Sequence, residues 1–416
     1  MTGPKCLAAF LILIAGGIAT PSSAVADGFG IHGSVAQRYK FRATGAAEDN
    51  DLETTLMLDL GDSQADRLSA AVMAAALIDL DRSTGNATFG SIYDTYSSRA
   101  VGRLYYAYGT ANDLGPVKQL RFGRQHRYEF ESLYFDGVHL ESDPFAHFTL
   151  SAFGGVPVHL FENQFGFDPG DWLVGGAVQW DPLANLRARA DYVYLRDKVT
   201  GFRASVGDQQ DHLFGGSVWW DPDQRVGLFG RFTAFSDQVR DATGQIVLRF
   251  PEQTMQWRIQ VYRLLKGYAV RVIDWDAFGI AGTYQPYTEI LASVSKGLGR
   301  HLTMEGGGQA RLLDSSQVAS AFNHGFTRGY LSATTADFPI DGMSISATGD
   351  YYHGQENSLK NDMFGGSAFI AQELMNRRMT LSGGTMYFLY RYDLFSGQET
   401  NDVQTYFARI KGKFSK

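Results

Sequence analysis

The feature that most constrains this chain is a strict alternation of apolar and polar residues in segments of about 10 to 14 residues. In residues 186–194, for example, Leu186 and Tyr192 fall on one face of a two-residue period, and Arg189 falls on the other. The same pattern recurs in 52–60, 72–79, 255–261, 302–312 and 405–414. A period of two with one apolar face predicts strands that bury one side only. We therefore expect an all-β fold.

An internal repeat indicates how the strands are joined. GGAVQWDPLANLRARADYVYLRD (175–197) is followed by GGSVWWDPDQRVGLFGRFTAFSD (215–237), with Gly-Gly, Trp-Asp-Pro and a closing Asp in register. Each copy consists of two alternating segments separated by an Asp-Pro turn. The repeat therefore predicts antiparallel hairpins that follow one another in a meander.

The connections between the predicted strands alternate between short and long. Short joins are expected at 61–66, 142–144, 181–184, 221–224, 296–300 and 374–378, and long ones at 81–97, 156–171, 198–211 and 313–325. Long strands with short turns at one rim and long loops at the other are typical of outer-membrane barrels. Aromatic clusters such as Tyr105, Tyr106 and Tyr108 are expected to lie at strand ends, as a membrane girdle requires.

The pattern predicts a transmembrane antiparallel up-and-down β-barrel of about 20 strands, and strand numbers from 18 to 22 fit the pattern. The least determined part is 268–287, which suits either two short strands or a loop folded into or over the channel. The rival environment for the apolar face is a second sheet, as in a soluble sandwich or propeller.

The first residues predict export. A Lys at position 5, an apolar run over 6–19 and the small residues of Ala24-Val25-Ala26 are the layout of a secretory signal peptide. We expect a signal peptide over 1–26 and the barrel over 27–416. Cys6 is the only cysteine, so the mature chain has no disulfide, thiolate metal site or haem-attachment motif. A net charge of −7 does not suggest a nucleic-acid partner.

At this point the chain resembles the porin-like outer-membrane β-barrels of bacteria. The last strand, YFARIKGKF (406–414), looks like the C-terminal assembly signal of such barrels, although two residues follow Phe414 here. LRFGRQ (120–125) and YFDGVHLE (134–141) also resemble strands of porin-like channels. The resemblance implies location in the bacterial outer membrane, with lipid around the barrel.

If the polar faces point inward, they line an aqueous channel, because barrels of about 16 or more strands are wide enough to hold water. A lumen with both charge signs suits passive diffusion of small hydrophilic solutes, and the alternative is that the charges pair and brace the wall. No His pair has metal-ligand spacing, and we expect no cofactor, metal site or enzymatic activity. The candidate lumen-lining residues are Glu53, Asp59, Asp79, Arg187, Arg189, Asp191, Gln256, Arg258, Gln260, Glu305, Gln309, Arg311, Arg409 and Lys411.

The main rival function is a sheath. Some porin-like barrels hold a separate multihaem cytochrome that carries electrons across the outer membrane, and such a partner would have to bring its own haems. A soluble secreted binding module is a third possibility. The sequence leaves the solute, the oligomeric state and the presence of a plug open.

Overall fold

The structure is a computed structural model that describes residues 30–43, 48–81, 98–127, 133–158, 170–197, 209–236, 238–265, 268–269, 283–284, 286–314, 325–354, 362–388 and 403–415. The predicted signal peptide and most of the predicted long connections lie outside these residues. Among the described residues, no helix has the length and hydropathy needed to cross a membrane. Apart from the short 3₁₀ helix η1 (Pro251–Gln253), the elements are strands. They are β1 (Ile31–Ala43), β2 (Glu48–Leu60), β3 (Leu68–Asp79), β4 (Ala100–Leu114), β5 (Val117–Arg127), β6 (Leu133–Ser142), β7 (Phe148–Pro157), β8 (Trp172–Leu183), β9 (Leu186–Asp197), β10 (Gln209–Trp220), β11 (Val226–Phe235), β12 (Gln238–Phe250), β13 (Met255–Leu264), β14 (Tyr268–Ala269), β15 (Thr283–Tyr284), β16 (Tyr287–Leu298), β17 (Leu302–Leu313), β18 (Phe326–Ala336), β19 (Met343–Gly354), β20 (Asp362–Leu374), β21 (Met379–Phe388) and β22 (Val403–Ser415).

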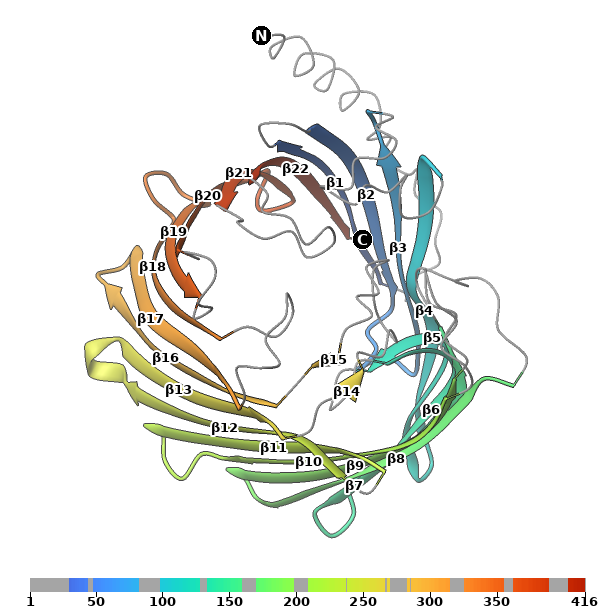
Figure 1. The fold of residues 1–416 in the computed structure, drawn as a ribbon. Coiled ribbons are helices and arrows are strands. Elements are labelled where there is room, and N and C mark those ends of the chain that lie inside the picture. Colours follow the sequence, from blue (N-terminus) through green and yellow to red (C-terminus); the bar gives the residue numbers. More distant parts are fainter. Residues whose placement is uncertain are drawn as a thin grey trace, which may run out of the picture. The chain divides into compact units, whose positions relative to one another are not determined.

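The strands form one closed antiparallel sheet of 20 strands (Figure 1). Each strand of this sheet pairs with the next along the chain, and β1 pairs with β22, so that His32–Ala43 lies against Gln404–Ser415. Closure leaves no unpaired edge strand. All backbone N–H and C=O groups of the sheet can therefore be hydrogen-bonded within it, as lipid surroundings require. The predicted barrel of about 20 strands is confirmed.

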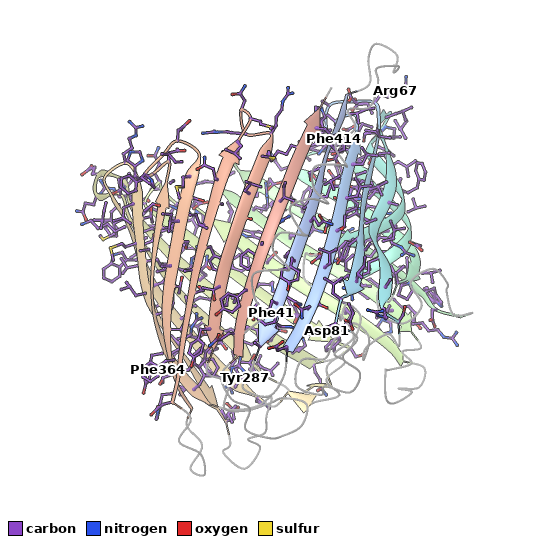
Figure 2. All side chains as sticks on the ribbon, turned by 90° about the horizontal axis from the view of Figure 1, so that it is seen from above. Phe41, Arg67, Asp81, Tyr287, Phe364 and Phe414 are labelled. Carbon is purple, nitrogen blue, oxygen red and sulfur yellow. The ribbon has the colours of Figure 1, made fainter. Side chains whose placement is uncertain are left out.

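The two rims of the barrel differ as the sequence predicts. Figure 2 shows Arg67 and Phe414 at one rim, and Asp81, Tyr287 and Phe364 at the opposite rim. The first rim carries short turns, at 61–67, 115–116, 143–147, 184–185, 221–225, 251–254, 299–301, 337–342 and 375–378. We call it the short-turn rim and the opposite one the loop rim. Both the start of β1 and the end of β22 lie at the short-turn rim, as an even number of strands requires.

The segment 268–287 contributes no strand to the wall. β14 and β15 pair only with each other, whereas β13 pairs directly with β16. In Figure 1 the small hairpin of β14 and β15 is seen inside the outline of the ring, and in Figure 2 it lies toward the loop rim. Two short strands are therefore present, but they do not belong to the barrel.

Candidate functional site: the inner face of the barrel

The pairing register gives the sheet two chemically different faces. Between β1 and β2, Val35 pairs with Leu56 on one face, and Arg38 pairs with Glu53 on the other. Val35 and Leu56 are 44% and 39% exposed. Exposed apolar side chains of this kind recur on every second residue around the ring, as a surface facing lipid requires. The opposite, polar face is the inner face, where the concave wall crowds the side chains together.

The register places every predicted lumen residue on this inner face. In each case the neighbouring positions on the same strand carry residues of the outer face, as with Gln256 and Gln260 on either side of Trp257 and Ile259. The residues so placed are Glu53, Asp59, Asp79, Arg187, Arg189, Asp191, Gln256, Arg258, Gln260, Glu305, Gln309, Arg311, Arg409 and Lys411.

Many inner-face charges are paired. On β1 and β2 a short ladder of ion pairs runs toward the loop rim: Arg38 contacts Glu53, Lys40 Nζ lies 2.9 Å from Asp51, and Arg42 Nε donates to Asp49 at 2.8 Å. Asp49 and Asp51 are only 1% and 6% exposed. In this part of the wall the charges of β1 and β2 pair with one another, which is the alternative to an unpaired charged lining.

A second set of pairs lies on β8 and β9 and on β16 to β19. Arg189 contacts Asp191 at 2.8 Å, and Arg187 contacts Asp181 at 2.9 Å. Glu289 accepts hydrogen bonds from Gln309 at 2.7 Å and from Arg311 at 2.8 Å. Sequence reasoning missed Glu289, although it occupies the inner-face period of its strand. Two further contacts there were also missed, Arg328 to Asp350 and Tyr330 to Glu305, each with a bond of 2.7 Å.

The inner face of β22 differs because, among the described residues, no acid pairs directly with its cations. Across the two flanking strands, Arg409 faces Arg38 and Ser382, Lys411 faces Ala36 and Thr380, and Lys413 faces Ser34. Among the described residues, no carboxylate lies within 4.0 Å of these three cations. Successive inner-face residues are about 6.8 Å apart along a strand. The three side chains thus form a column of positive charge, the β22 cation column.

Aromatic side chains also contribute to the inner face. Tyr106 and Tyr108 pair with Met73 and Ala71 in the middle of the wall, and Arg121 lies 4.5 Å above the Tyr108 ring. The prediction that these tyrosines form a girdle at strand ends is therefore wrong for Tyr106 and Tyr108. A bulge in β4 between the positions opposite Met73 and Ala74 shifts the alternation, which sequence periodicity alone does not reveal.

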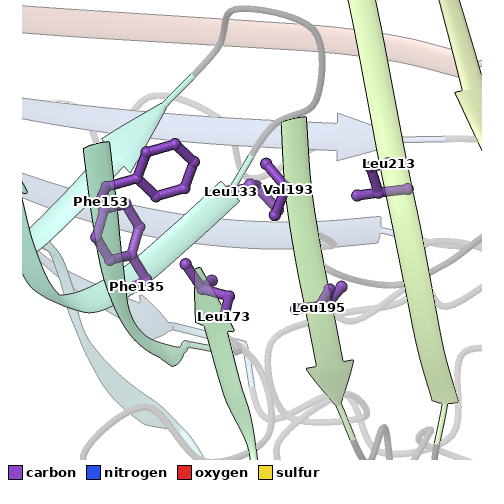
Figure 3. Packing of buried hydrophobic residues seen from close by; sticks show 7 residues of the cluster. All are labelled: Leu133, Phe135, Phe153, Leu173, Val193, Leu195 and Leu213. Carbon is purple, nitrogen blue, oxygen red and sulfur yellow. The ribbon is translucent and has the colours of Figure 1, made fainter. Parts of the chain in front are cut away.

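One part of the inner face is apolar, contrary to the expectation of a polar lining throughout. Seven residues near the loop rim of β6 to β10 form a buried cluster, each at most 6% exposed, shown in Figure 3. Arg127 lies 4.2 Å above one ring of this cluster, that of Phe153. This side of the inner face is therefore packed with apolar side chains near the loop rim. The cluster consists of Leu133, Phe135, Phe153, Leu173, Val193, Leu195 and Leu213.

The described part of the chain contains no group of three or more His, Cys, Asp or Glu side chains that could hold a metal ion. What the inner face offers chemically is a set of fixed charges, guanidinium groups and hydroxyls. Such groups attract and orient charged solutes by electrostatics and hydrogen bonds.

Comparison with known proteins shows the fold. No protein-family model matches the chain, and no curated protein matches its sequence. Solved structures do match: Pseudomonas aeruginosa OpdK with vanillate has a TM-score of 0.56 at 9% identity, over 94% of this chain and 100% of that one. P. aeruginosa OccK2 (OpdF) in complex with glucuronate gives 0.56 at 11%, over 94% and 100%, and P. aeruginosa OccK8 (OprE) gives 0.54 at 8%, over 94% and 100%. The chain therefore has the barrel fold of the OccK and Opd outer-membrane porins.

Proposed function

We propose that the protein is an outer-membrane channel for passive diffusion of small hydrophilic solutes, with a preference for anions. The observation that carries the preference is the β22 cation column. Among the described residues, no carboxylate lies within 4.0 Å of its charges, whereas Asp49, Asp51 and Glu53 of β2 pair with cations of β1. An uncompensated column of cations on the wall lowers the energy of an anion in the adjoining part of the lumen.

The solutes of the similar structures agree with this preference. Vanillate and glucuronate, named with OpdK and OccK2, each carry one carboxylate. By analogy we propose small organic acids as the solutes of this channel. The likeness to structures crystallised with solutes also supports the channel over the cytochrome sheath. We propose no enzymatic step, since diffusion through fixed charges requires none.

Location follows from the same proposal. We infer that the chain is exported through a signal peptide over 1–26 and that residues 27–416 sit in the outer membrane, with the short-turn rim toward the periplasm. Mass spectrometry of the membrane fraction should find a mature N-terminus at Asp27. A retained Met1, or protein found only in the soluble fraction, would contradict the assignment.

Ion conductance tests the channel directly. Purified protein in planar bilayers should conduct, and under a salt gradient its reversal potential should report anion selectivity. Replacing the β22 cation column (Arg409→Gln, Lys411→Gln and Lys413→Gln together) should shift the reversal potential toward zero. The matched control is Arg38→Gln with Glu53→Gln, which removes a pair without changing net charge. Absence of conductance would refute the channel, and cation selectivity would refute the preference.

A further inference from the structure

The short-turn end of the β22 cation column lies in a pocket lined by several cations. The pocket has a volume of about 380 Å³ and is lined by His32, Asp59, Arg377, Arg378, Lys411 and Lys413, among others. His32 and Asp59 face each other across β1 and β2, and Lys411 and Lys413 come from β22. Arg377 and Arg378 come from the turn between β20 and β21. Two separate parts of the chain thus bring cations to one place, at the seam where the barrel closes.

The charges of this pocket do not cancel. Glu373 lies 3.1 Å from Arg377 and neutralises it. Among the described residues, no acid lies within 4.0 Å of Arg378, Lys411 or Lys413. Asp59 is the one carboxylate among the described lining residues. Two positive charges therefore remain uncompensated within a space of the size that binds small molecules.

The turn that presents the arginines is held in an unusual conformation. Met375, Asn376 and Arg377 have φ values of 53°, 53° and 67°. Three consecutive non-glycine residues in the left-handed region are costly, and such strain persists where the surroundings fix it, most often at functional sites. Here the surroundings include a hydrogen bond from the Lys413 backbone N–H to the Arg378 carbonyl oxygen, at 2.7 Å. This bond ties the arginine turn to the strand that carries the lysines.

We propose that this pocket binds a dissolved oxyanion with two or more negative charges, of the phosphate or dicarboxylate class. A guanidinium recognises such groups with paired hydrogen bonds, and lysine contributes a mobile point charge. Because Lys411 and Lys413 point to the inner face, the ligand reaches the pocket from the mouth of the barrel and not from the lipid. The inference uses the proposed channel only for this route, and binding itself does not depend on conductance.

The first test is binding to the full chain in detergent, measured by calorimetry with inorganic phosphate and with succinate, and with acetate as the singly charged comparison. Phosphate and succinate should bind more tightly than acetate. Arg378→Gln with Lys413→Gln should weaken phosphate binding by about tenfold or more, because charged hydrogen bonds are lost. Arg225→Gln is the matched control, since Arg225 is an exposed cation on another turn of the same rim, and it should leave binding unchanged. Equal phosphate binding by wild type and double variant would overturn the proposal.

Two further measurements separate the alternatives. Addition of short-chain phosphatidylglycerol should not displace phosphate, and displacement would assign the pocket to a lipid headgroup and overturn the assignment to a dissolved ion. In planar bilayers, phosphate should reduce the current when added on the short-turn side, and the double variant should lose this effect. A conducting channel without phosphate binding would refute the pocket and leave the proposed function intact, whereas binding without conductance would do the reverse.

Discussion

At the scale of single residues, the wall depends on close approaches that only glycine permits. Gly137 on β6 pairs with Gly155 on β7. A Cβ added to Gly137 would lie 2.1 Å from the carbonyl oxygen of Gly154, which is a fixed backbone atom. Elsewhere a ring fills the space beside a glycine, as Phe232 does beside Gly216. The many glycines and aromatic residues of the composition are thus partly explained by strand pairing.

Gly137→Ala should therefore destabilise the barrel by about 1–3 kcal/mol, because the two strands must move apart to admit the methyl group. The change in the free energy of unfolding is measured by guanidinium titration, with the folded fraction read from the gel mobility of unboiled samples. Gly230→Ala is the control, since nothing lies within 4 Å of a Cβ at that position. Equal stability of the two variants would show that β6 and β7 are not so closely packed.

The inner-face ion pairs differ in how much they should matter. Arg42 pairs with Asp49 and shares Asp51 with Lys40, and the two carboxylates are 1% and 6% exposed. Arg42→Ala leaves two crowded carboxylates with less compensation, and we expect a loss of about 3–5 kcal/mol at neutral pH. Arg38 is 49% exposed, so that Arg38→Ala should cost about 1 kcal/mol or less. Chemical unfolding of both variants tests the ranking, which the opposite order would contradict.

At the scale of elements, the repeated motif is a hairpin whose parts face one another. The second glycine of each copy pairs with the later aromatic residue, Gly176 with Tyr192 and Gly216 with Phe232. Asp181 contacts Arg187 of its own copy at 2.9 Å. Asp221 instead contacts Arg249 of β12, outside the second copy, at 3.0 Å. The sequence repeat therefore corresponds to two hairpins, β8–β9 and β10–β11, in which equivalent residues pair in the same way.

Strand periodicity predicted these elements well and failed where both faces are apolar. Tyr192 to Leu195 forms an unbroken apolar run at the end of β9, and Val193 and Leu195 belong to the buried inner cluster. Such a run is the available signal for a strand covered on both faces. What covers it depends on contacts between distant segments, which alternation within one strand does not encode.

Neighbouring residues on β13 should tolerate charge very differently. Ile259 is on the outer face and 43% exposed, and Gln260 is on the inner face. Ile259→Arg should cost about 2–4 kcal/mol if the residue lies near the middle of the bilayer, whereas Gln260→Arg should fold normally. The folded fraction after refolding into lipid vesicles, read from gel mobility, compares them. Normal folding of Ile259→Arg together with failure of Gln260→Arg would mean that the two faces have been exchanged.

At the scale of the whole molecule, the sequence predicts the strand number but not the ion pairs. Alternation and turn signals indicate about 20 strands, and closure follows because an edge is costly in lipid. The contact of Arg328 with Asp350 depends on the register between β18 and β19, which is set by their shared hairpin and by the shear of the complete barrel. The basic pocket lies at the seam where the first strand, β1, meets the last, β22. It cannot be predicted from the sequence of any one segment, because its residues come together only when the barrel closes.

The seam itself can be tested by a disulfide. Gln37 on β1 pairs with Ile410 on β22, and paired Cα atoms of antiparallel strands are about 4.5–5.5 Å apart, within the range that a disulfide spans. Because Cys6 is the only native cysteine and lies in the predicted signal peptide, Gln37→Cys with Ile410→Cys should give one intramolecular bond on mild oxidation. The control, Gln37→Cys with Ile345→Cys, joins β1 to β19, which do not pair, and should give none. A crosslink in the control alone, or only between molecules, would mean that β1 and β22 do not close the ring.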